Sequence, residues 1–262
     1  MSAFLLFYYT DYVHISAGIV GTIMLVSRIF DGVTDLIMGV IVDRTKSKMG
    51  KCRPWILRMA IPFAIAGILL FSVPSGLGQT AKIAYIFITY NLVSSVIYTA
   101  INVPYATLNA LITQDQYERS VLSIFRMILA TTGTLIITNL TLPLVQAFGN
   151  NASAWTKAFA VFGVLAVIIF LITFTTKERV KPSEHTKQEK IPFFKGIRLL
   201  FQNKYWIMIT LTLVFIFIIY SLNGGAAVYY AKVVLKNPNL VGPMNLVASI
   251  VQIVAMFFAA FI

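Results

Sequence analysis

An arginine and two aspartates lie inside one long apolar stretch of the sequence, residues 17–42. Arg28, Asp31 and Asp35 follow one another at intervals of three and four residues. A helix turns by about 100° per residue, so these three side chains share one face. A charged side chain that faces lipid costs a few kcal/mol, so such residues normally face a protein interior or a water-filled cavity. Two carboxylates one helical turn apart therefore indicate a binding site for a small cation.

The same spacing leaves a second interpretation open. Arg28 and Asp31 are three residues apart, so their side chains can meet on a helix. Arg28 could then form a buried ion pair with Asp31 or Asp35, and the acids would have a purely structural role.

A second group of polar residues lies on the apolar stretch 82–111, spaced by three, four or seven residues. Its members are Asn91, Ser94, Tyr98, Asn102, Tyr105 and Asn109. Polar residues in membrane helices often only join helices through hydrogen bonds, and this interpretation stays open. A full row of them in register, with two tyrosines, favours the wall of a polar cavity. Amide and phenol groups beside aromatic faces suit a neutral, hydroxylated solute such as a sugar.

Arg126 lies a few residues into the next apolar stretch, 121–147. Its side chain either extends to the lipid headgroups or donates hydrogen bonds. In the second case the acceptors are substrate hydroxyls or a carboxylate of the stretch 17–42.

The composition is that of a membrane protein. Of the 262 residues, 58% are hydrophobic and 11% are charged, whereas a soluble domain has about a quarter charged residues. The net charge of +12 does not indicate a nucleic-acid partner, because the basic residues lie in short loops between apolar runs. His14 and His185 lack metal-ligand partners at useful spacing, and no nucleophile-elbow, P-loop or HExxH motif is present. We predict neither an enzyme nor a cofactor.

Apolar runs predict an all-α membrane protein. The expected spans are 17–42, 55–74, 82–111, 121–147, 156–176 and 205–231, with a further one starting near 241. Residues 1–13 are too short to cross a bilayer and predict the end of a helix, and the chain stops within an apolar run. Both ends lead us to expect a fragment of a longer protein.

Loop charges predict the orientation and the domains. The loops 43–58 and 177–204 are rich in lysine and arginine, so we expect both on the cytoplasmic side of a multi-pass protein. The loop 177–204 is also the one sizeable hydrophilic linker. It separates an N-terminal helical half, 1–176, from the start of a second half, 205–262. Its part 191–200 predicts an amphipathic helix at the membrane surface.

Eight motifs along the chain resemble one known family. They are 8–11 (YYTD), 28–35 (RIFDGVTD), 39–45 (GVIVDRT), 50–55 (GKCRPW), 98–105 (YTAINVPY), 115–119 (DQYER), 125–126 (FR) and 223–230 (NGGAAVYY). In this order they resemble the glycoside–pentoside–hexuronide:cation symporters of the major facilitator superfamily, of which melibiose permease is the best-known member. The resemblance covers essentially the whole chain.

The resemblance implies a fold and three sets of residues. The fold is two helical bundles of about six helices each, of which this chain would run from the end of helix I to part of helix VIII. The implied cation site, for sodium or a proton, is Asp31, Asp35 and Thr99. The implied sugar contacts are Tyr98, Asn102 and Arg126. The implied cytoplasmic gate includes Gly39, Asp43 and Arg44.

Three residues depart from the family pattern. Asn102 and Ala106 stand where melibiose permease has an aspartate and a sugar-stacking tryptophan. Both changes disfavour an α-galactoside and favour another substrate of the family, such as a xyloside or a glucuronide. Thr34 replaces an asparagine of the cation site, which leaves the choice of ion open.

The predicted function is cation-coupled symport of a sugar across the cell membrane by alternating access. We expect the partners to be the sugar and the lipid bilayer, and the full-length protein to function as a monomer. Two alternatives stay open at this point: a membrane-embedded enzyme, and a sensor or partner that does not transport.

Overall fold

The computed structural model describes residues 2–179, 193–230, 234–236 and 241–259. The regular secondary structure in these ranges is helical, as expected where apolar segments must satisfy their own backbone hydrogen bonds. The chain divides into two compact units, Met1–Lys181 and Pro182–Ile262. Each unit is described by itself.

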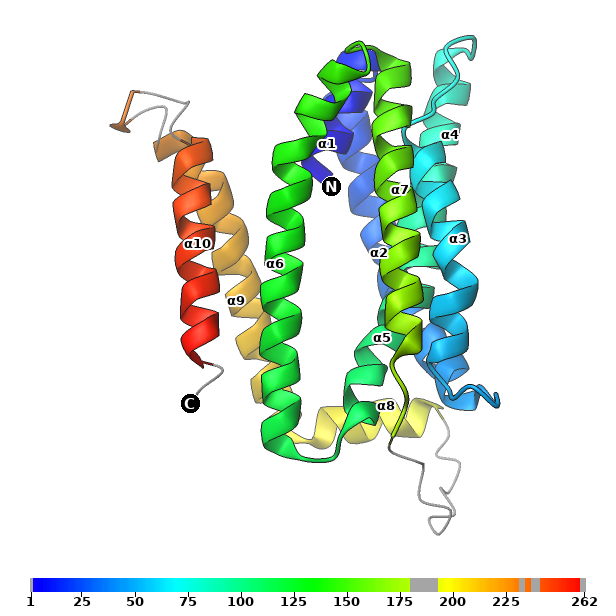
Figure 1. Ribbon diagram of the computed structural model, residues 1–262, viewed down its shortest axis with the longest axis vertical. Helices are drawn as coiled ribbons and strands as arrows, with labels where there is room; N and C mark the ends of the chain where they lie inside the picture. The colour runs from blue at the N-terminus through cyan, green and yellow to red at the C-terminus, as the bar shows by residue number, and fades with distance from the viewer. Residues whose placement is uncertain (1, 180–192, 231–233, 237–240, 260–262) are drawn as a thin grey trace. The chain divides into compact units, whose positions relative to one another are not determined.

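The first unit holds the helices that carry the predicted site (Figure 1). They are α1 (Ser2–Phe7), η1 (Tyr8–Tyr12), α2 (Ala17–Arg44), α3 (Arg53–Leu70), α4 (Gln79–Asn91), η2 (Leu92–Tyr98), α5 (Thr99–Ile112), α6 (Gln116–Ala147) and α7 (Ala152–Thr175). The segments η1 and η2 are π-helices. Without a break, α4, η2 and α5 form one long helix, Gln79–Ile112.

The second unit contains α8 (Phe193–Gln202), α9 (Lys204–Tyr229) and α10 (Val241–Ala259). The last two coincide with the expected spans 205–231 and the one starting near 241. The helix α8 confirms the helix expected at 191–200, although residues 191 and 192 lie outside the described part. Residues 180–192 of the linker also lie outside it, so the two-half organisation stays a prediction.

Four described helices are long and apolar enough to cross a membrane: Arg53–Leu70, Gln79–Ile112, Gln116–Ala147 and Ala152–Thr175. They coincide with the expected spans 55–74, 82–111, 121–147 and 156–176. The helix α2, with 28 residues, is not one of the four. It carries Arg28, Asp31 and Asp35, so its place depends on the helices that pack against it.

Packing inside the first unit follows from small residues at helix contacts. The helix α3 lies along α7, and α2 lies along the long helix Gln79–Ile112. At one α3–α7 contact, a β-carbon added to Gly163 would lie 3.3 Å from the Ala64 β-carbon. Such small residues let membrane helices approach closely, because lipid itself provides no hydrophobic force that brings helices together.

Buried aromatic side chains join the first residues of the chain to α3 and α7. The hydroxyl groups of Tyr8 and Tyr9 donate to the carbonyl oxygens of Phe71 and Leu70, each at 3.0 Å. These carbonyls end α3, where no intrahelical donor remains for them. The Trp155 ring, on α7, stacks on Phe71. The hydrogen bonds and rings together fix η1 against the ends of two other helices.

The connection between α5 and α6 explains the motif 115–119. Asp115 is the N-cap of α6, and its Oδ1 accepts the Glu118 backbone N–H at 2.8 Å. The guanidinium of Arg119 donates to the carbonyl oxygens of Thr113 and Ala110 at 2.8 and 3.1 Å. These bonds satisfy backbone groups at two helix ends. In this motif, therefore, the charges hold a tight turn.

A substitution at Trp155 tests the aromatic contact. Its side chain is fully buried, yet its Nε1 has no hydrogen-bond partner within the described residues. We expect Trp155→Ala to reduce the free energy of unfolding by about 3–5 kcal/mol, because it leaves a cavity. Trp155→Phe should cost less than about 1.5 kcal/mol, since it loses no hydrogen bond. Thermal unfolding of the detergent-solubilised protein measures both, and equal losses would contradict this account.

Candidate functional site

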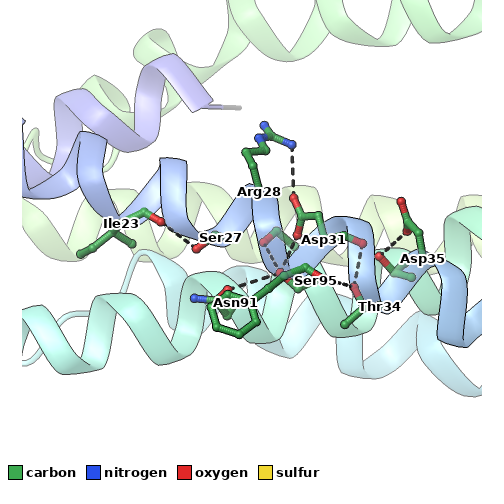
Figure 2. Close-up of polar contacts among 11 residues, drawn as sticks. Ile23, Ser27, Arg28, Asp31, Thr34, Asp35, Asn91 and Ser95 are labelled. Atoms are coloured by element: carbon green, nitrogen blue, oxygen red, sulfur yellow. Dashed lines mark hydrogen bonds and ion pairs between the residues drawn. The ribbon is translucent and has the colours of Figure 1, made fainter. Parts of the chain in front are cut away.

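The helix α2 and the long helix Gln79–Ile112 run parallel and meet at the two aspartates (Figure 2). Ser95 Oγ donates a hydrogen bond of 2.5 Å to Asp31 Oδ1. Thr99 Oγ1 donates one of 2.9 Å to Asp35 Oδ1. Both pairs are 64 residues apart in the sequence, so the second contact repeats the first one helical turn further on. Each carboxylate thus faces one hydroxyl group of the neighbouring helix.

The arginine pairs with one of the two acids. Arg28 Nη1 lies 3.3 Å from Asp31 Oδ2, and this is the ion pair found within the described residues. The Arg28 side chain is 69% exposed, while that of Asp31 is 19% exposed. The alternative interpretation from the sequence is therefore right about the contact and wrong about its burial. Asp35 has no cationic side chain within 4.0 Å in the described part of the chain.

The predicted row of polar residues runs through the π-helix η2. Ser95, which the row did not include, donates to Asp31, and Ser94 contacts the Ser95 hydroxyl at 3.3 Å. Ser95 is four residues from both Asn91 and Thr99, so it shares a helix face with them. The row as the wall of a sugar cavity stays a prediction.

Two other polar side chains beside the acids are engaged with backbone or neighbouring groups. Thr34 Oγ1 donates within its own helix, 3.0 Å from the carbonyl oxygens of both Phe30 and Asp31. Asn91 Nδ2 donates to the Phe87 carbonyl oxygen at 2.8 Å. The residue that departs from the family pattern, Thr34, thus directs its proton to α2 itself.

Of the predicted sugar-binding residues, Arg126 contacts the polar row at Tyr105. Tyr98 is 51% exposed and Asn102 is partly buried. The Arg126 guanidinium carbon lies 4.8 Å from the centre of the Tyr105 ring, a cation–π contact between α6 and α5. A cavity of about 280 Å³ beside this pair is lined by residues of α5, α6 and α7, without Tyr98 or Asn102. Asn109 Nδ2 donates to Ser123 Oγ at 3.0 Å, so this member of the row joins two helices.

The predicted gate residues occupy the last turns of α2. A β-carbon added to Gly39 would meet nothing within 4 Å. Asp43 and Arg44 are exposed and form no ion pair with any residue in the described ranges. Their role in closing the cytoplasmic side stays a prediction.

Sequence reasoning missed a carboxylate that holds the loop before α3. Glu178 accepts backbone N–H bonds from Lys51, Cys52 and Arg53 at 2.9, 2.8 and 3.3 Å. Gly50 has φ of +102°, and a β-carbon there would lie 2.4 Å from the Glu178 carboxylate. The partly positive N-terminus of a helix attracts such an anion. The sequence signal that could have revealed this anion site is Gly50 shortly before Arg53-Pro54, at the start of a helix.

Comparisons with known proteins match this chain to sugar transporters and symporters. The family described as MFS/sugar transport protein matches residues 1–262. The chain is 37% identical over 240 residues to the inner membrane symporter YicJ of Escherichia coli (strain K12), covering 90% of this chain and 51% of that protein. It is 37% identical over 243 residues to the putative glycoside/cation symporter YagG of the same organism, with the same two shares.

A third relative is the isoprimeverose transporter of Lactiplantibacillus pentosus. The chain is 36% identical to it over 241 residues, which are 88% of this chain and 49% of that transporter. The chain thus spans about half the length of the curated relatives it matches.

The rate at which the single cysteine, Cys52, is chemically labelled tests the Glu178 contact. Cys52 is fully buried, and burial together with the Glu178 charge raises the pKa of its thiol to about 12. The thiolate is the reactive form, so maleimide labelling of Cys52 should stay slow from pH 7 to 9. We expect Glu178→Gln to speed labelling about tenfold, because the weaker acceptor lets the loop open and removes the charge.

Mass spectrometry of the peptide that contains Cys52 measures this labelling. Glu118→Gln is the matched control, because Glu118 accepts its hydrogen bonds at the α5–α6 turn. Equal labelling of wild type and Glu178→Gln would contradict the proposed contact.

Proposed function

The chain belongs to the MFS/sugar transport protein family, and on that basis we propose that it acts in cation-coupled symport of a sugar. The proposed mechanism is secondary active transport by alternating access, driven by sodium or by protons. The observation that carries the proposal is the pair of aspartates on α2, each bonded to a hydroxyl group of the facing helix. Family membership argues against the membrane-embedded enzyme.

The cation's part in the mechanism follows from electrostatics. Asp31 and Asp35 lie one turn apart on the apolar helix α2, where two negative charges repel each other. A bound sodium ion or proton reduces that repulsion. The ion also has hydroxyl oxygens available on η2 and α5, from Ser95 and Thr99. Binding of the ion therefore favours close contact between α2 and the long helix Gln79–Ile112.

Coupling to the sugar would pass through the same long helix. Tyr98 precedes and Asn102 lies one turn beyond Thr99, whose hydroxyl group donates to Asp35 Oδ1. An ion that holds Thr99 in place would hold these two side chains for the sugar. Each ligand then raises the affinity for the other by the same factor, as linkage requires. The loaded site would open to either side by rocking of two helical halves.

We propose a glycoside, pentoside or hexuronide as the substrate class. Two of the matched relatives are named as a putative glycoside/cation symporter and an isoprimeverose transporter. Asn102 offers an amide and Ala106 offers no ring, which argues against substrates that need a carboxylate and a stacked aromatic side chain at these positions. Amide donors and acceptors, with a phenol at Tyr98, suit hydroxyl groups of neutral sugars.

We further propose a location and an assembly state. The protein would lie in the cell membrane as a multi-pass monomer, with the loops 43–58 and 177–204 on the cytoplasmic side. The excess of lysine and arginine in these two loops supports this orientation.

Neutralising the aspartates tests cation coupling. We expect Asp31→Asn or Asp35→Asn in the full-length transporter to abolish sugar accumulation against a gradient, because an amide cannot replace the charge that binds the ion. Radiolabelled sugar uptake under an imposed sodium or proton gradient measures this. The matched control is Asp115→Asn, which keeps a good helix N-cap and should transport normally. Full uphill uptake in both site variants would contradict the assignment, and no uptake by wild type would favour a non-transporting role.

A second substitution tests the sugar contact. We expect Arg126→Lys to raise the sugar concentration for half-maximal uptake about tenfold, because lysine lacks the planar fork that binds two hydroxyl groups. The cation dependence of the remaining uptake should persist. Arg58→Lys, at an exposed position of α3, serves as the control. An unchanged sugar concentration dependence would instead assign Arg126 to packing against Tyr105.

A further inference from the structure

Ser95 is a buried residue whose hydroxyl group bonds to a neighbouring helix. Its side chain is 2% exposed and lies in the π-helix η2, one turn before Thr99. Most hydroxyl groups of helices in this chain bond to the carbonyl four residues earlier, as Ser27 does to Ile23 and Thr107 does to Val103. Ser95 instead bonds across to Asp31 Oδ1 on another helix. Its hydroxyl oxygen lies 2.5 Å from Asp31 Oδ1 and 3.3 Å from Asn91 Oδ1, so the carboxylate is the closer acceptor.

Ser95 and Thr99 face α2 together. They are four residues apart, so they lie on the same side of the long helix Gln79–Ile112. Ser95 lies within the π-helix η2, and π-helical turns frequently occur at functional sites. Asp31 thus has a hydroxyl partner that matches the one of Asp35.

We propose that Ser95 is a further oxygen ligand of the coupling cation and helps to set which cation binds. This inference rests on the proposed function, because it assigns a residue to the same ion site. The Ser95 hydroxyl has two lone pairs besides the donated proton. The Ser94 hydroxyl contacts Ser95 Oγ at 3.3 Å, which leaves one lone pair for a monovalent metal ion held by Asp31. The ion would then have one carboxylate and one hydroxyl oxygen at each of two successive helical turns.

The negative charge of Asp31 needs hydrogen-bond donors or cations close to it, and Ser95 provides one such donor. Arg28 contacts Asp31 Oδ2, but its own side chain is mostly exposed, so it compensates the charge only weakly. Asp31 Oδ1 has Ser95 as its partner. Without that hydroxyl, the oxygen would lose its buried donor and the ion would lose a ligand. Affinity for small hard cations depends on the number of oxygen ligands and the size of the site.

Cation titrations of the full-length transporter test the role of Ser95. We expect Ser95→Ala to raise the sodium concentration for half-maximal stimulation of sugar uptake about tenfold, the effect of one lost hydrogen bond or ligand to a charged group. The ratio of the half-maximal sodium and lithium concentrations should also change. Sugar affinity at saturating cation should stay the same. Ser95→Thr keeps the hydroxyl and should retain both the affinity and the ratio.

Ser27→Ala is the matched control, because the buried Ser27 hydroxyl donates to the Ile23 carbonyl of its own helix. Sodium binding to the purified proteins by calorimetry repeats the comparison without transport, and it also serves if Ser95→Ala is poorly active. Unchanged titrations for sodium, lithium and protons in Ser95→Ala would overturn the proposal. If Asp35→Asn still abolishes coupling in that case, cation symport itself stands. If wild type shows no cation stimulation, the proposed function fails first.

Discussion

Carboxylates on an apolar helix need hydrogen-bond donors, and this need determines how α2 packs against the long helix Gln79–Ile112. Asp31 and Asp35 cannot face lipid without a large cost. The facing helix meets the need with Ser95 and Thr99, at the same offset along both chains. Because the two contacts are one turn apart, they fix the axial position of α2 against its neighbour as well as its rotation. A small shift along either axis would break both contacts together.

The rest of the unit supports that contact from both ends. At one end, Tyr8 and Tyr9 donate to the last carbonyls of α3, and the aromatic rings hold α7 beside them. At the other end, Glu178 holds the start of α3. Polar groups at helix ends therefore bond to other helices, which keeps the scaffold around the aspartates rigid. A site that must discriminate between small ions needs such fixed positions.

Much of this arrangement could be predicted from the sequence, and the failures have physical causes. Apolar length predicted the spans, because a helix must cover the bilayer thickness whatever its neighbours are. Spacing predicted the acids on one face of α2. Ser95 was missed, because the row took its neighbour Ser94 and not the four-residue step from Asn91 to Ser95 and Thr99. Glu178 was missed, because its partners are backbone N–H groups more than a hundred residues away, which no pattern of side chains reveals.

The end of α7 has a mechanical consequence. Glu178 is bonded to the start of α3, Arg53 Nε donates to the Phe174 carbonyl oxygen at 2.8 Å, and the Arg179 backbone N–H donates to Leu111 at the end of α5. Three helices are thus joined within a few residues of one another. A force applied to the chain after residue 179 would act on α3, α5 and α7 as one body. Such a force would then move α3, α5 and α7 together and would not unwind any one of them.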